Sequence, residues 1–237
     1  MTIKPLSRES GPSVSGPERG VARPGALVDE VYEAILDRIM SLRIQPGSKI
    51  TVDNLAREMG VSQTPIREAL SRLEVEGLVL KTHLIGYSAA SQLNRKQVEQ
   101  LFELRLLLEP AAAAWAASQI NGKQGHELNV LQADMVRLRD DQVSSYAQFA
   151  RKDAEFHALI AAVSGNALLA DALMRLHTHV HIFRLVFHTR VTSEALVEHA
   201  DILAAIVARD AEASERTMRA HVLASRDRFL TLVGSLE

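Results

Sequence analysis

Three histidines and one aspartate in the second half of this 237-residue chain have the residue types and spacing of a metal site. Asp153 and His157 are four residues apart, which places them on one face of a helix, at the edge of an apolar stripe. His199 and His221 fall on the apolar sides of the next-to-last and last expected helices. One carboxylate and three imidazoles that converge from three helices suit a divalent transition metal such as Zn, Ni, Mn or Fe. The alternative for each histidine is a core position in which its ring bonds to a backbone carbonyl.

Few other residues have side chains that could bind a metal or take part in catalysis. His177 and His181 also lie four residues apart, and they either line a pocket and offer a rival metal pair or serve ordinary surface and packing roles. Trp115, the single tryptophan, is expected in the core and not as a platform for a cofactor. The chain has no cysteine, which excludes disulfides, thiol catalysis, iron–sulfur clusters and zinc sites with cysteine ligands. It also has no Gly-x-Ser-x-Gly nucleophile and no phosphate-binding glycine loop.

A second set of polar residues lies near the start of a helix that is expected to follow Ser62. On a helical wheel Gln63, Arg67 and Ser71 fall on one side, with Thr64 nearby, away from the apolar stripe. The N-terminal part of such a helix meets base edges when it enters the major groove of DNA. Arg67 can contact guanine and Gln63 adenine, each through two hydrogen bonds. The hydroxyls of Ser62 and Thr64 suit phosphates.

Three further residues complete this candidate DNA-binding set. Pro65 stands in the first turn of the same helix, where its missing N–H is harmless. Arg72 lies on a different side and either supports the fold or reaches the DNA backbone, and His83 is expected at the tip of a wing. Residues 27–90 contain seven Lys and Arg against nine Asp and Glu, so this segment is not a basic patch. The hypothesis therefore depends on the local pattern and not on net charge.

The elements that must position these DNA-binding residues follow a definite order. Residues 1–26 are rich in Pro, Gly and Ser and are expected to form a disordered tail. A helix then begins near Leu27 and must stop before Pro46. The elements expected after it are a very short strand at 50–52, a short helix capped by Asp53 and closed by Gly60, the helix after Ser62, which ends at Gly77, and extended pieces at 78–81 and 85–89. This order predicts a winged helix-turn-helix over residues 27–90.

The second half of the chain, residues 94–234, is expected to be helical throughout. Helices are predicted at 94–118, 125–142, 144–163, 166–189, 193–208 and 210–234. Six antiparallel helices of this length form a bundle with room for an interior pocket. Hydrophobic residues make up 47% of the chain but aromatic residues only 4%, which favours helices over a β-sandwich. The expected fold class is therefore mostly α, with one small β wing.

Composition also bears on where the chain works. The formal net charge is −2, which gives no hint of nucleic acid. The longest run of small apolar residues, Ala111–Ala117, is too short to cross a bilayer, and residues 1–26 contain no apolar segment typical of a secretory signal. We therefore expect a bacterial-type cytoplasmic protein with no membrane partner.

The stretch Leu55–Val79 resembles the GntR family of bacterial transcription regulators, whose usual pattern there is LA-x-x-x-GVSRTPVREAL-x-x-L-x-x-x-GLV. This resemblance implies a winged helix whose third helix reads an operator in double-stranded DNA. Gln63 departs from the pattern, because the family typically has a DNA-contacting arginine at that position. The departure puts the usual base preference in doubt, whereas Arg67 keeps its expected identity.

Motifs in the second half resemble the all-helical FCD domain of the FadR subfamily, namely Glu103–Glu109, Asp153–His157, Ser164–Asn166, Glu198–His199 and Met218–His221. In metal-binding members one Asp and three His in these motifs hold the ion, which implies that the quartet described above is the ligand set. The remaining coordination positions would be open to water or to an effector carboxylate. In similar regulators an arginine at the position of Arg105 helps to fix an acidic effector. The alternative for Arg105 is a salt bridge with Glu109, one turn later.

The function expected from these resemblances is that of a homodimeric transcription regulator, by default a repressor. A small carboxylate bound near the metal would change its affinity for an operator with two-fold pseudo-symmetry. The alternative from another class is a metal-dependent hydrolase in which the quartet activates a water molecule, although no separate general acid or base stands out. A third alternative is a metal with a purely structural role.

Overall fold

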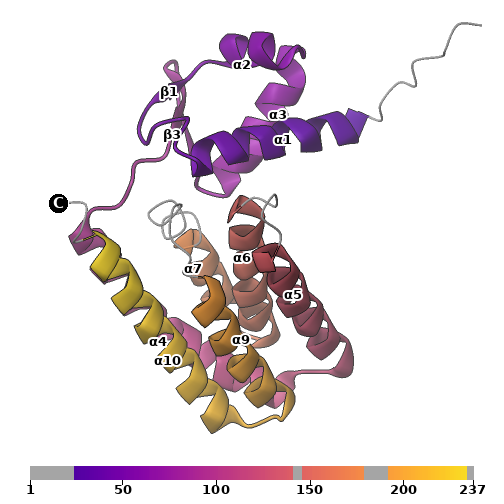
Figure 1. Cartoon of the computed structure of the whole chain (residues 1–237), viewed down its shortest axis with the longest axis vertical. Helices are drawn as coiled ribbons and strands as arrows, with labels where there is room; N and C mark the ends of the chain where they lie inside the picture. The colour runs from indigo at the N-terminus through magenta and orange to yellow at the C-terminus, as the bar shows by residue number, and fades with distance from the viewer. Residues whose placement is uncertain (1–23, 141–145, 179–191, 234–237) are drawn as a thin grey trace, which may run out of the picture.

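The computed structural model describes residues 24–140, 146–178 and 192–233. A small head lies at one end of a bundle of helices (Figure 1). The head consists of α1 (Pro24–Met40), β1 (Lys49–Ile50), α2 (Val52–Met59), α3 (Gln63–Val75), β2 (Val79–Thr82) and β3 (Gly86–Ala89). The bundle consists of α4 (Arg95–Gln119), α5 (Gly122–Asp140), α6 (Tyr146–Val163), α7 (Ala167–Arg175), α9 (Thr192–Val207) and α10 (Ala211–Val233). The expected fold class is confirmed. No helix in these ranges is both long enough and apolar enough to cross a membrane.

The head is built around an apolar core between α1 and α3. Ile35 and Ile39 of α1 and Ile66 and Leu70 of α3 are all fully buried in this core. Their spacing of four residues puts each pair on one stripe of its helix. Burial of an Ile or Leu side chain contributes about 1.5–3 kcal/mol. The core therefore fixes the position of α3, the helix expected to read DNA. Helix α1 begins at Pro24, slightly before the expected start.

The tight turn between α2 and α3 depends on Gly60, whose φ of 67° lies in the left-handed region that glycine tolerates best. The N–H of Val61 donates to the carbonyl oxygen of Ala56 at 3.0 Å and closes the end of α2. Ser62 is the N-cap residue of α3, as expected, although its side chain makes no capping hydrogen bond. The predicted cap at Asp53 is wrong, because α2 begins at Val52 and Asp53 lies within its first turn.

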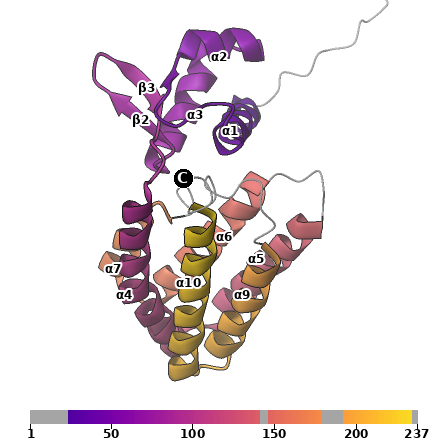
Figure 2. The same ribbon diagram turned by 60° about the vertical axis from the view of Figure 1, so that its left-hand side comes forward.

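The wing is an antiparallel three-stranded sheet with the order β1-β3-β2. Tyr87 of β3 pairs with Ile50 on one side and with Lys81 on the other. The very short strand expected at residue 50 therefore joins the predicted ribbon as its third strand. His83 and Leu84 lie in the turn between β2 and β3, which projects from the head (Figure 2).

Helices α4 and α10 lie side by side along the length of the bundle (Figures 1 and 2). A capping box fixes the start of α4: the Asn94 side chain accepts from the Gln97 N–H, and the Gln97 side chain accepts from the Asn94 N–H. The rings of Phe102 and Phe229 stack in the core with their centres 6.1 Å apart. This pairing brings residues near 105 on α4 close to residues near 225 on α10.

Two expectations for the bundle are wrong. The helix predicted at 166–189 ends at Arg175, because His177 has a φ of 45°, which interrupts a right-handed helix. Its ring lies against Gly77 of the head, where a β-carbon would collide with it. His181 lies outside the described residues, so that the predicted His177–His181 pair is not described. Trp115 was expected in the core, but its side chain is 43% exposed on α4.

Helix α6 contacts the head through polar side chains. Arg151 donates from Nη1 to Oε1 of Glu33 on α1 at 2.5 Å, and its guanidinium carbon lies 5.7 Å from the centre of the Tyr32 ring. The Tyr32 hydroxyl donates to Oε2 of Glu76 at 2.6 Å. Glu76 is the C-cap residue of α3. A chain of polar contacts thus links the bundle to the C-terminal end of α3.

Candidate metal centre and DNA-binding surface

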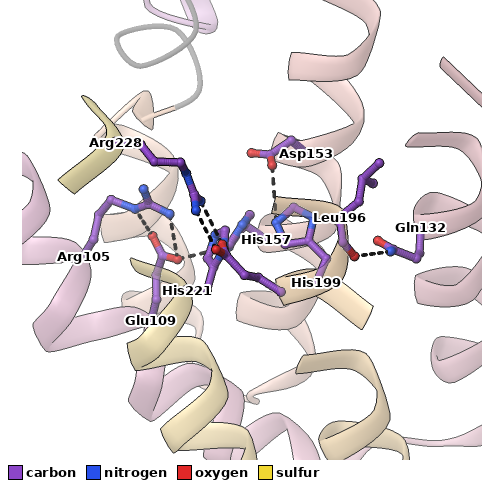
Figure 3. Close-up of polar contacts among 10 residues, drawn as sticks. Arg105, Glu109, Gln132, Asp153, His157, Leu196, His199, His221 and Arg228 are labelled. Atoms are coloured by element: carbon purple, nitrogen blue, oxygen red, sulfur yellow. Dashed lines mark hydrogen bonds and ion pairs between the residues drawn. The ribbon is translucent and has the colours of Figure 1, made fainter. Parts of the chain in front are cut away.

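The three histidines of the predicted quartet come together in the bundle (Figure 3). His157 comes from α6, His199 from α9 and His221 from α10, and one ring nitrogen of each lies within 4.8 Å of the others. The ring centres are 5.2 Å apart for His157 and His199 and 4.7 Å apart for His199 and His221. The packing of three helices thus places three nitrogen donors where one ion can contact all of them.

The ring nitrogens of two of these histidines have no hydrogen-bond partner. Both nitrogens of His157 and both of His199 are buried without one. The Nδ1 atom of His157 does lie 3.0 Å from Oε2 of Glu109, but the pair does not have the geometry of a hydrogen bond. Buried polar groups without partners are rare in folded proteins. The alternative of core histidines that bond to backbone carbonyls is therefore not what these two residues do, and their free nitrogens fit a metal ion.

Asp153 approaches the same group from the His199 side. Its Oδ1 atom lies 3.4 Å from Nε2 of His199, although it stands outside the compact group of three imidazoles. Burial raises the pKa of Asp153, while the neighbouring His157 and Arg105 lower it in part. A bound cation would offset that cost of burial, and the role of Asp153 as fourth ligand stays a prediction.

Burial favours the neutral form of two of the three histidines, His199 and His221, which suits metal binding. Burial lowers the pKa of His199 well below its usual range, and the nearby His221 and His157 lower it further. Burial also lowers the pKa of His221 well below its usual range, and His157 lowers it further. A neutral imidazole keeps a lone pair on one nitrogen, which is the form that binds a metal.

Arg105 and Glu109 form a buried ion pair beside His157. Arg105 donates from Nε to Oε1 of Glu109 at 2.5 Å and from Nη2 to Oε2 at 3.2 Å. Burial alone would raise the pKa of Glu109, but the charges of Arg105 and His157 hold it well below its usual range. The salt-bridge alternative for Arg105 is therefore formed. Arg105 also lines the cavity described below, and its Nη1 atom has no hydrogen bond among the described residues.

Two charged residues next to His221 were not predicted as part of the site. Glu198 of α9 accepts from Nδ1 of His221 at 2.7 Å, and Arg228 of α10 donates to both oxygens of Glu198. A signal was present in the sequence, since Glu198 precedes His199 directly and Arg228 follows His221 by two helical turns. The role of Glu109 beside His157 was missed as well, because it was considered only as a partner for Arg105.

A cavity of about 480 Å³ adjoins two of the histidines, His157 and His221. This volume is in the range of small-molecule sites. Its polar end includes Arg105, Glu109, His157 and His221, and much of the remaining wall is apolar: Phe149, Ala154, Ala158, Ala161, Ala162, Ala170, Leu173, Met174 and Phe229. Tyr32 and Glu76 of the head line the same cavity. One cavity therefore touches three of the four candidate metal ligands, Asp153, His157 and His221, and the end of α3.

The candidate DNA-binding residues at the start of α3 are largely accessible. Ser62, Gln63, Thr64 and Arg67 are exposed. Arg67 donates from Nη2 to Oε1 of Gln63 at 3.1 Å, and Gln63 donates in turn to Asp53 of α2. The two side chains expected to contact bases are thus held next to each other at the start of α3.

The remaining members of the predicted set differ in their surroundings. Pro65 is buried, so that it shapes the first turn of α3 and offers no accessible ring. Arg72 stacks over the Tyr32 ring at 4.3 Å and donates to Asp29 of α1 at 2.6 Å. These contacts fit one of the two roles expected for Arg72, support of the fold. His83 is exposed in the wing turn.

Both halves of the chain match known protein families. The family described as "Bacterial regulatory proteins, gntR family" matches residues 27–86, and the FCD domain matches residues 100–224. The chain is 26% identical over 196 residues to the uncharacterized HTH-type transcriptional regulator YdhC of Bacillus subtilis, which covers 81% of this chain and 86% of the relative. It is also 26% identical to the HTH-type transcriptional repressor RspR of Escherichia coli, over 81% of this chain and 84% of the relative.

Solved structures share the fold. Escherichia coli McbR/YncC superposes with a TM-score of 0.65 at 19% identity and covers 86% of this chain and 96% of its own. A putative transcriptional regulator GntR from Rhodococcus sp. RHA1 gives a TM-score of 0.63 at 17% identity, over 87% and 98% of the two chains. The families and the relatives named are regulators, so they confirm the expectation of a non-enzyme and give no support to the hydrolase alternative. The chain belongs to the gntR family of bacterial regulatory proteins and is a DNA-binding transcription regulator with a C-terminal FCD effector-binding domain.

Proposed function

We propose that this regulator is a homodimeric, metal-containing repressor of the FadR subfamily that releases its operator when a small organic acid binds in the FCD domain. The observation that carries the proposal is the set of unpartnered, buried ring nitrogens next to a cavity that reaches the head. An ion in the bundle, an acid in the cavity and a DNA-reading helix at its far end would form one connected system.

The metal site consists of Asp153, His157, His199 and His221. Three imidazoles and one carboxylate suit Zn, Ni, Mn or Fe. When bound, the ion supplies a positive charge and coordination positions that water or an effector carboxylate can occupy. Arg105 lies at the same end of the cavity, and its Nη1 atom is available to donate to the same carboxylate.

On the DNA side, Arg67 and Gln63 read base edges, while Ser62, Thr64 and His83 contact the phosphate backbone or the minor groove. Their exposure at the start of α3 and at the wing tip supports these roles. Pro65 contributes through the backbone of the first turn, and Arg72 acts by fixing α3 against α1. Since the operator lies on the chromosome, we infer that the protein works in the bacterial cytoplasm.

The homodimer is supported by an apolar surface on the bundle. Leu104, Leu107 and Trp115 are exposed along α4. A surface of this kind on one helix can be buried by the same surface of a second copy around a two-fold axis. Two heads related in this way would contact two half-sites of a pseudo-symmetric operator.

Regulation requires only that the effector binds the DNA-competent and DNA-incompetent states with different affinities. A coupling of about 1–3 kcal/mol is sufficient for a clear response. Repression is proposed because the Escherichia coli relative RspR is named a transcriptional repressor. A purely structural metal remains the alternative, and it predicts that metal removal lowers stability without altering the response to an effector.

One experiment tests the core of the proposal. Elemental analysis and native mass spectrometry of the purified protein should find a divalent transition metal and, where one is retained, a bound acid. Binding to the DNA upstream of its own gene should then exceed binding to unrelated duplexes, and a chelator or the retained acid should change that affinity. Equal, weak binding to all duplexes under every condition would exclude the proposed function.

A further inference from the structure

The hydrogen bonds of His221 differ from those of the other two histidines. Its Nδ1 atom lies 2.7 Å from Oε2 of Glu198, whereas His157 and His199 have no hydrogen-bond partner on either ring nitrogen. Because an ionised carboxylate can only accept, Nδ1 of His221 is the donor in this contact. Nε2 is therefore the nitrogen of His221 that is left to bind an ion.

Glu198 is itself held in place by Arg228. Nη1 of Arg228 donates to Oε1 of Glu198 at 2.6 Å, and Nη2 donates to Oε2 at 2.8 Å. This two-point pairing fixes the plane of the carboxylate. Both side chains are mostly shielded from solvent, with 22% exposure for Glu198 and 16% for Arg228. Solvent therefore screens this pair less than an exposed one, and Glu198 cannot rotate away from His221 without breaking two charged hydrogen bonds.

We infer that Glu198 is a positioning residue for the metal centre: held by Arg228, it orients His221 so that Nε2 faces the other ligands. This inference rests on the proposed metal site. Carboxylates that accept from the second nitrogen of a metal-binding histidine typically change metal affinity 10–100-fold when they are removed. Neither Glu198 nor Arg228 is required to touch the ion for this effect.

Glu194 provides a matched control on the same helix. It lies one turn before Glu198 and also contacts Arg228, at 3.4 Å, but its side chain is 74% exposed. The hydrogen-bond acceptor observed at Nδ1 of His221 is Glu198. Removal of Glu194 thus changes the charge around Arg228 and leaves the orientation of His221 intact.

The test measures metal affinity of the full-length protein by competition between the chain and a chromophoric chelator for Zn²⁺ or Co²⁺. Glu198→Ala should weaken binding about 10–100-fold, Glu198→Gln should weaken it less because its amide oxygen can still accept, and Glu194→Ala should bind as the unmutated protein does. The visible spectrum of the Co²⁺ form should change in Glu198→Ala only. Urea unfolding of the metal-free variants reports whether each one folds.

A double-mutant cycle separates positioning from general destabilisation. If Glu198 acts through His221, Glu198→Ala should lower affinity little or not at all in a His221→Ala background. Equal affinities for Glu198→Ala, Glu194→Ala and the unmutated chain would overturn the inference, and so would additive losses in the cycle. If the unmutated chain binds no metal, the proposed metal site and this inference both fail. If it binds metal and the variants match it, only the inference fails.

Discussion

Arg151 of the bundle and Glu33 of the head form an ion pair across the boundary between the two parts, with 2.5 Å between Nη1 and Oε1. Arg151 stands two residues before the candidate metal ligand Asp153 on α6, and both line the cavity. Glu33 follows Tyr32, whose hydroxyl bonds to the C-cap residue of α3. A displacement of α6 caused by a bound ion or acid would therefore act directly on the elements that hold α3.

Arg151→Ala should weaken the coupling between metal binding and operator affinity more than it lowers the free energy of unfolding. Both partners are more than a third exposed, so that the pair contributes no more than about 1 kcal/mol to the free energy of unfolding. We expect the ratio of operator affinities with and without metal to move toward one, while metal affinity is unchanged. The ratio is measured by fluorescence anisotropy with labelled operator DNA.

The control for this prediction is Arg95→Ala, which breaks an ion pair of similar exposure between Arg95 and Glu99 on α4. The exchange of the two charges in the double variant Arg151→Glu, Glu33→Arg should restore part of the ratio. A full response in Arg151→Ala would show that the ion pair does not transmit the signal.

Tyr32→Phe should destabilise the head, and the effect should depend on pH. Burial raises the pKa of Glu76, and the hydrogen bond from the Tyr32 hydroxyl lowers it in part. A carboxyl group whose folded pKa lies above the unfolded value stabilises fully below that value, and its contribution is lost as pH rises through the folded pKa. Loss of the hydroxyl raises the folded pKa further. The variant should therefore lose about 1–3 kcal/mol of unfolding free energy at pH 7 and less at pH 4.5.

Urea unfolding at the two pH values measures the difference. Tyr87→Phe is the matched control, because Tyr87 is another buried tyrosine of the head, and its recorded contact is with Lys81 across the ring face. A loss in Tyr32→Phe that is the same at both pH values would contradict the assigned role of Glu76.

The head could be predicted from the sequence in some detail because its signals are local. Apolar residues at helical spacing identified α1 and α3, and Gly60 marked the end of α2, where the left-handed conformation requires it. The end of α7 carried no such signal. The chain leaves the helix at His177, a residue type that does not mark helix ends, and the ring of His177 then packs against Gly77 of the head.

Only part of the metal centre could be predicted, because some of its contacts join residues that are far apart in the sequence. The spacing of Asp153 and His157 within one helix is visible in the sequence, and so is the apolar side on which each remaining histidine lies. The contact of Glu198 with His221 joins two helices across 23 residues, and the approach of Glu109 to His157 joins two others. Such contacts follow from helix packing, which hydrophobic periodicity alone does not specify.

Arg67→Ala should weaken operator binding by about 1–3 kcal/mol and relax the preference at one base position in each half-site. Arg67 is exposed near the start of α3 and is held beside Gln63, so that its guanidinium is presented without cost to the core. Gel shifts with single-base operator variants measure both effects. Arg216→Ala on α10, which removes an exposed arginine paired with Glu212, should bind like the unmutated protein. Unchanged selectivity in Arg67→Ala would remove it from the reading surface.

The metal-free protein should lose stability as pH falls below 6.5. Burial, reinforced by neighbouring positive groups, lowers the folded pKa of His199 and His221 well below 6.5, whereas the unfolded chain binds protons at both residues near that pH. Their contribution is complete above 6.5 and is lost as pH falls from 6.5 toward the folded pKa values. Each histidine can account for up to about 1.4 kcal/mol per pH unit.

Urea unfolding in EDTA at pH 7.5, 6.5 and 5.5 measures this dependence. His221→Gln should show a shallower decrease, because it removes one of the two buried groups that titrate only after unfolding. His126→Gln changes an exposed histidine on α5 and should follow the unmutated protein. Saturating Zn²⁺ should raise the free energy of unfolding without flattening the decrease near pH 6.5, because the rings of the folded state are already neutral there with or without the ion. Stability that does not vary between pH 7.5 and 5.5 without metal would mean that His199 and His221 bind protons equally well in the folded and unfolded protein, which would contradict their lowered folded pKa values.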